Sequence, residues 1–148
     1  MKAISKFFSL AFLGMVLTLA CACSDSNNEE EPNQLSDISG VWSEYAYLCS
    51  DGYFVDISAT GYNMYYEFAR PNNFVQYSFD QDGNRGIDKQ GKWTFDPNTQ
   101  TAHIDEPRGW NLDIKFEFAQ SSSDEATLYI VGRTQNSNST VKVKRIKK

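Results

Sequence analysis

The chain has 148 residues, of which 41% are hydrophobic, 14% aromatic and 22% charged. This length suits one domain, and the aromatic content favours a packed core over a disordered or coiled-coil chain. The formal charge of −5 argues against nucleic-acid binding, which needs clustered Lys and Arg, and three Cys with one His are too few for a zinc ribbon or a zinc finger.

The first element along the chain is an export signal over residues 1–22. Lys2 and Lys6 precede an apolar run from Phe7 to Ala20, which has the length of a signal-peptide core and is shorter than the roughly 20 residues that span a bilayer. The run ends in the sequence Leu-Ala-Cys-Ala-Cys-Ser at residues 19–24. This segment resembles a bacterial lipobox, which implies that a cysteine is lipidated and anchors the protein to a membrane.

Two cysteines fit the lipobox, Cys21 and Cys23. Cys23 is the preferred lipidation site, because it opens directly into a polar acidic stretch, whereas lipidation of Cys21 would leave Cys23 as a stray thiol. Residues 23–36 then form a flexible tether with few large apolar side chains, and the folded domain covers residues 37–148.

The location of the protein follows from this anchor. The acidic stretch resembles the surface-export signal of Bacteroidota lipoproteins, and a solvated linker explains it equally well. The sequence therefore predicts a protein of the cell envelope, anchored in the outer membrane and exposed at the surface if the export signal is real.

The domain has an all-β pattern. Segments with a period of two recur between turn signals, and no window has the 3.6-residue period of an amphipathic helix. The connections have the length of hairpin loops, so neighbouring strands should be antiparallel. The predicted strands are 42–48, 53–57, 62–69, 74–79, 89–95, 101–105, 111–118, 126–133 and 140–146.

The alternation of apolar and polar residues assigns the faces of these strands. Within 111–118, every second residue from Leu112 to Phe118 is apolar and the residues between them are polar, which is typical of a strand with one face in water. Eight or nine such strands have exposed edges unless the sheet closes. We therefore predict an up-and-down antiparallel barrel of about eight strands, with a two-sheet β-sandwich as the alternative.

The start of the first strand carries a family resemblance. Gly40, Val41 and Trp42 form a Gly-x-Trp pattern at the mouth of a meander of strands, and this resembles the lipocalin signature. With the lipobox and the acidic tether, the whole chain is similar to the small lipocalin-like lipoproteins of Bacteroidota. The resemblance implies structural roles for Gly40 and Trp42 at one closed end of the barrel, with Arg145 capping the indole. If Trp42 faces the interior, the alternation of the strand also places Glu44 inside, either as a buried polar contact or next to a bulge that shifts the register.

Two functions of different kinds are compatible with such a domain. The first is a carrier that binds a small apolar or amphiphilic molecule in the barrel. The second is an interaction module with a filled core, which binds a glycan or an envelope protein through a rim that contains Trp110. The candidate ligand-binding residues are Tyr62, Tyr66, Tyr77, Trp93, Trp110 and Phe116.

The sequence predicts no enzyme, cofactor or metal. His103 lies on the polar side of its strand with Asp105 two residues on, but no nucleophile motif accompanies it. Cys49 has no nearby histidine and is interpreted as a structural thiol. The segment 80–84 lacks the Gly and Glu spacing of a calcium loop and predicts a hairpin turn instead.

Overall fold

The computed structural model describes residues 37–57, 63–133 and 137–147, which belong to one compact unit, Glu31–Lys148. The predicted signal peptide, Cys23, the tether and Tyr62 lie outside the described residues. All regular structure in the described part is β-strand. The strands are β1 (Gly40–Leu48), β2 (Phe54–Asp56), β3 (Met64–Ala69), β4 (Asn73–Phe79), β5 (Arg85–Asp96), β6 (Thr101–Asp105), β7 (Leu112–Ala119), β8 (Ser122–Gly132) and β9 (Asn138–Ile146).

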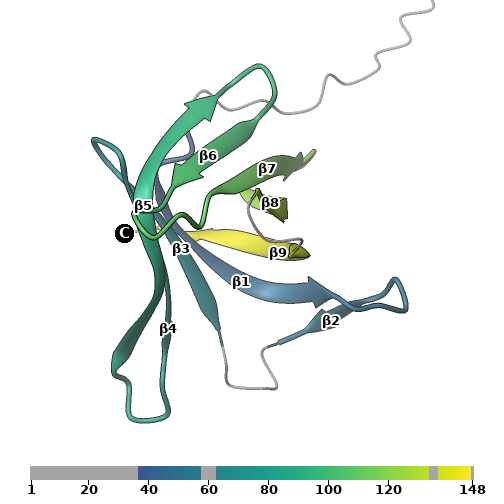
Figure 1. The fold of residues 1–148 in the computed structure, drawn as a ribbon. Coiled ribbons are helices and arrows are strands. Elements are labelled where there is room, and N and C mark those ends of the chain that lie inside the picture. The colour runs from purple at the N-terminus through teal and green to yellow at the C-terminus, as the bar shows by residue number, and fades with distance from the viewer. Residues whose placement is uncertain (1–36, 58–62, 134–136, 148) are drawn as a thin grey trace, which may run out of the picture. The chain divides into compact units, whose positions relative to one another are not determined.

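The sheet closes into an antiparallel barrel of eight strands, as predicted (Figure 1). β1 pairs with β3 along one edge and with β9 along the other, so the first and last strands of the meander meet. The ninth strand, β2, pairs only with the end of β1, between Ala46 and Leu48, and lies outside the ring of eight. Because the sheet is closed, the sandwich alternative is wrong.

Strand β5 connects two parts of the barrel wall. Its first part pairs with β4, and its last part, from Lys92 to Asp96, pairs with β6 (Figure 1). Gly91 lies where the pairing changes, and a Cβ atom on it would lie 2.5 Å from the carbonyl oxygen of Asp105. The backbone of the β6 end can pass this closely only because residue 91 has no side chain.

The observed β5 begins four residues before the predicted strand. The turn between β4 and β5 explains the difference, because Asp80 accepts hydrogen bonds from the backbone N–H groups of Asp82 and Asn84. With Gly83 at a φ of 81°, this tight turn lets pairing resume at Arg85, in a polar stretch that carries no apolar alternation.

The core lies on the inner face of the sheet. Leu112, Ile114, Phe116 and Phe118 are all buried, as the alternation in β7 predicted. The buried residues of the other strands join them in one hydrophobic cluster, in which Trp42, Phe68, Leu128 and Val143 are fully enclosed. This single cluster gives Glu31–Lys148 a core of its own, so the unit contains what it needs to fold independently.

Candidate ligand site in the barrel

One end of the barrel, here called the closed end, is built around Trp42. Its indole is fully buried and donates a hydrogen bond to the carbonyl oxygen of Ile38 at 3.0 Å. The guanidinium of Arg145 lies 4.4 Å from the ring centroid, and Arg145 also donates to the carbonyl oxygen of Asp37. Gly40, at a φ of 132°, gives the chain the conformation it needs to enter β1 beside Arg145. These three residues lie together in the arrangement expected for a lipocalin-like barrel.

Aromatic rings fill the interior next to Trp42. The centroid of Phe116 lies 5.6 Å from the centroids of Trp42, Phe68 and Phe118. Trp93 packs edge-on against Phe68 and donates from Nε1 to the carbonyl oxygen of Ala69. Phe116 and Trp93 were predicted as ligand-binding residues. Both lie in the packed part of the interior, where their rings contact the same ring, that of Phe68.

The opposite end, here called the open end, is where β1 ends and β3 begins. Between the two ends, on the inner face, Tyr66 is the cross-strand partner of Trp42, and its hydroxyl donates to Glu44 Oε2 at 3.0 Å. Burial raises the pKa of Glu44, although the hydrogen bond from Tyr66 acts in the opposite direction. Burial also raises the pKa of Tyr66 far above its usual value, and the nearby Glu44 carboxylate adds to this effect. The pair is thus a neutral phenol bonded to a carboxyl group in a poorly solvated place.

Both alternatives for Glu44 are realised. The residue faces the interior opposite Val143, and the pairing of β1 with β9 shifts directly after it, between Glu44 and Ala46. The bulge shifts the register directly after the interior carboxyl group, and the pairing then continues to Tyr47. Bulges are common next to active sites.

Gln76 completes this group of polar residues. It is the direct neighbour of Tyr66 across the β3–β4 pair and is only 8% exposed. Its side chain forms no hydrogen bond with any other residue that the structure describes. Likewise, no cation in the described part of the chain forms an ion pair with Glu44. The sequence patterns gave no reason to select Gln76, since a lone amide in a strand resembles any solvent-facing residue.

Trp110 lies on the rim of the open end. It belongs to the β6–β7 connection, which reaches the barrel beside the start of β7, and 42% of its surface is exposed. The ammonium group of Lys89 lies 5.7 Å from the centroid of its indole and 3.0 Å from Asp88 Oδ2. Lys89 is opposite Gln76 in the sheet and therefore lies on the inner face. Lys89 was not among the predicted site residues. It lies an even number of positions before Trp93 in β5, so the alternation of the strand predicts the same face for both side chains.

Tyr77 does not line the interior, contrary to the prediction. It is paired with Tyr65 and stacks on that ring at 5.1 Å, on the outer face of the barrel. Arg85 lies over the other part of the ring at 3.7 Å and is bonded to Glu67, also on the outside. In β4 the residues that face inward are Phe74 and Gln76, so the apolar alternation of Val75, Tyr77 and Phe79 marks the outer face instead.

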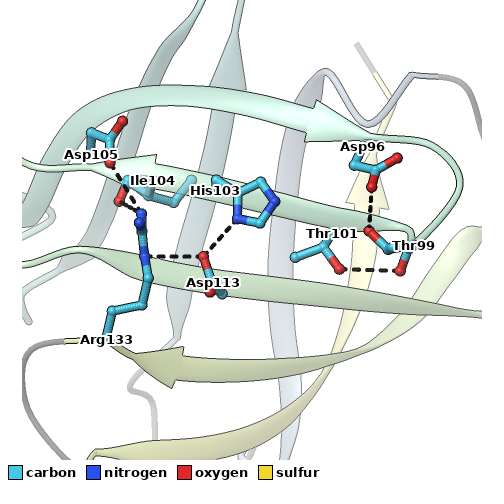
Figure 2. A network of polar contacts seen from close by, with 8 residues as sticks. All are labelled: Asp96, Thr99, Thr101, His103, Ile104, Asp105, Asp113 and Arg133. Carbon is cyan, nitrogen blue, oxygen red and sulfur yellow. Dashed lines mark hydrogen bonds and ion pairs between the residues drawn. The ribbon is translucent and has the colours of Figure 1, made fainter.

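His103 belongs to a polar network on the outer face of β6 and β7 (Figure 2). Its Nδ1 lies 2.8 Å from Asp113 Oδ1, and Arg133 Nε lies 3.1 Å from the same oxygen. Asp105, the neighbour in sequence, pairs with Arg133 rather than with His103. Within the described residues, no hydroxyl or thiol is hydrogen-bonded to His103, and no group of His, Cys, Asp and Glu is arranged to hold a metal ion.

Two grooves of about 500 Å³ flank Arg145 on the barrel surface. The charges on their walls are already matched: Lys144 pairs with Glu125 at 3.1 Å, and Arg70 pairs with Asp37 at 2.6 Å. These ion pairs are exposed to solvent, so each contributes little to stability.

No protein-family model matches the chain, and no curated protein matches it either. In the part of the chain that the structure describes, no helix is long and apolar enough to cross a membrane.

Proposed function

We propose that this chain is a lipid-anchored envelope lipoprotein whose lipocalin-like barrel binds a small apolar or amphiphilic molecule through its open end. The observation that carries the proposal is the inward-facing group of Glu44, Tyr66 and Gln76. The apolar residues of the inner face include Leu112, Ile130 and Val141, and Lys89 is opposite Gln76. Apolar walls with a few convergent polar groups are typical of small-molecule sites.

The anchor is supported by the lipobox-like segment at residues 19–24 and by the polar stretch after it. If Cys23 is lipidated, globomycin should block processing of the precursor, and the mature protein should partition into detergent. Replacing Cys23 by Ala, with Cys21 retained, should abolish both effects. A processed protein that stays in the aqueous phase would contradict the anchor.

A second candidate function is binding of a glycan or an envelope protein by the rim. The exposed indole of Trp110 favours it, because aromatic faces at the surface stack on sugar rings and anchor protein interfaces. We place it second, because it depends on one partly exposed ring, whereas the carrier function depends on three inward-facing polar side chains.

Titration with the neutral apolar dye N-phenylnaphthylamine separates the two functions. The protein used is the chain from Ser24 onward, which lacks the lipid and retains the whole compact unit Glu31–Lys148. The carrier function predicts saturable binding with a micromolar Kd, equivalent to about −8 kcal/mol. Tyr66→Ala should weaken it by tenfold or more, whereas Tyr129→Ala, on the outer face, should not. Absence of saturable binding by the folded protein would reject the carrier function, and loss of glycan or partner binding in Trp110→Ala would support the alternative.

A further inference from the structure

The polar group of Glu44, Tyr66 and Gln76 is unusual because its strongest acceptor, the Glu44 carboxylate, forms no ion pair with a described residue. Among the described residues, the Glu44 carboxylate accepts one hydrogen bond, from Tyr66, and pairs with no Lys or Arg. Lys89 is the inward-facing cation of this region, and its ammonium group is already bonded to Asp88. A partly buried carboxylate is costly unless a positive charge or several donors accompany it. The structure thus leaves the charge of Glu44 without a positively charged partner among the described residues.

The three side chains provide a matching number of acceptors. Glu44 has a second carboxylate oxygen, the Tyr66 oxygen can still accept after donating its proton, and the Gln76 carbonyl forms no hydrogen bond with a described residue. Tyr66 in β3 pairs with Gln76 in β4 on one side and with Trp42 in β1 on the other. Glu44 is also in β1, so Glu44, Tyr66 and Gln76 come from three adjacent strands and face the interior. Gln76 is the direct cross-strand neighbour of Tyr66, about 5 Å away at Cβ, and the Tyr66 hydroxyl reaches Glu44 on its other side through the hydrogen bond of 3.0 Å.

From this geometry we propose that Glu44, Tyr66 and Gln76 bind the ammonium group of a primary alkylamine, whose hydrocarbon tail lies against the apolar inner wall. This specificity rests on the carrier function proposed above and names the chemical class of the ligand. The three N–H donors of an ammonium group match the three acceptors, and its charge compensates Glu44. The polar group thereby acts as a headgroup site, and an anionic or neutral headgroup would lack the charge pairing.

The test is competition against N-phenylnaphthylamine by three amphiphiles of equal chain length, each below its micelle concentration: dodecylammonium, dodecanol and dodecanoate. The proposal predicts that dodecylammonium displaces the dye at a concentration about tenfold lower than dodecanol, as expected for a charge-assisted hydrogen bond, and that dodecanoate is weakest. Equal displacement by all three, or preference for dodecanoate through Lys89, would overturn it.

Glu44→Gln keeps the size of the side chain and removes its charge. It should reduce the preference for dodecylammonium over dodecanol to within about twofold. Glu117→Gln is the matched control, since Glu117 accepts a hydrogen bond from a tyrosine, Tyr129, on the outer face. An equal effect of both variants would show a general charge effect and overturn the site.

The two proposals fail in different ways. If the dye and dodecanol bind but dodecylammonium has no advantage in the wild type, the carrier function stands and the ammonium site is wrong. If the folded protein binds neither the dye nor any of the three amphiphiles, both proposals fall.

Discussion

At the scale of single residues, Trp42 combines complete burial with two polar contacts. Its indole N–H is bonded to Ile38, its face is covered by Arg145, and its edge packs against Phe116. Trp42→Ala should therefore lower the free energy of unfolding by about 3 to 5 kcal/mol, as large-to-small core changes do. Urea denaturation followed by circular dichroism measures this difference.

Trp110→Ala is the matched control for that measurement, because the same residue type is partly exposed on the rim. It should change the free energy of unfolding by about 0.5 kcal/mol or less. Similar losses for both tryptophans would contradict the assignment of Trp42 to the closed end.

Glu44 should make stability depend on pH. Because burial raises its pKa in the folded state, with Tyr66 opposing in part, the folded protein binds this proton more tightly than the unfolded chain. The free energy of unfolding therefore falls as pH rises from 4.5, the ordinary pKa of a glutamate, through the raised pKa of Glu44 in the folded protein. Glu44→Gln cannot ionise, so the Tm of the variant relative to that of the wild type should increase as pH rises through this window. Parallel Tm profiles of the two proteins would contradict the burial of Glu44.

Residue faces could be predicted where apolar residues alternate on the inner face. Tyr66 and Phe116 were placed inside correctly on this basis, whereas Tyr77 was not. The interior of β4 carries the polar Gln76, while Tyr65 and Arg85 cover Tyr77 from outside. Alternation reports which face is apolar, and here the outer face of one strand is the more apolar one.

At the scale of elements, β5 depends on a glycine at its turning point. Gly91→Ala would place a Cβ atom 2.5 Å from the Asp105 carbonyl oxygen, so backbone must move and the free energy of unfolding should fall by about 1 to 3 kcal/mol. Gly86→Ala, in the same strand, meets its nearest atom at 3.9 Å. It should be neutral or slightly stabilising, by up to about 1 kcal/mol, because alanine restricts the unfolded chain.

Thermal unfolding of the two variants, side by side, measures the difference. An equal effect at both glycines would contradict the close approach of β5 and β6. The same comparison bears on prediction from sequence: Gly91 lies in the regular alternation of 89–95, and nothing local distinguishes it from a glycine that merely weakens a strand. Its role depends on a contact with a residue 14 positions later in the chain.

The candidate site shows the same limit. Glu44, Tyr66 and Gln76 lie on three strands, and only the register of β1, β3 and β4 brings them together. Parity in β1 predicted that Glu44 faces inward, but its hydrogen bond to Tyr66 required the pairing between strands. The sequence predicts elements and faces, and the closed sheet determines which side chains meet.

At the scale of the whole molecule, closure of the meander was predictable from the number of strands, their hairpin connections and the cost of exposed edges. The small extra strand β2 was counted among the barrel strands in the sequence pattern, but it pairs only with the end of β1. The interior is packed around Trp42, and Glu44, Tyr66 and Gln76 form a polar group on the inner face beside it. This arrangement underlies the proposed carrier function.

Native mass spectrometry of the protein purified from its own host membrane tests that function most directly. We expect the lipid-modified chain to carry the additional mass of one small molecule, which gentle activation releases and which excess dodecylammonium displaces. The Tyr66→Ala protein, purified in the same way, should retain less of it. A folded wild-type protein that carries only its own lipid, under the mildest activation that gives resolved ions, would contradict the account.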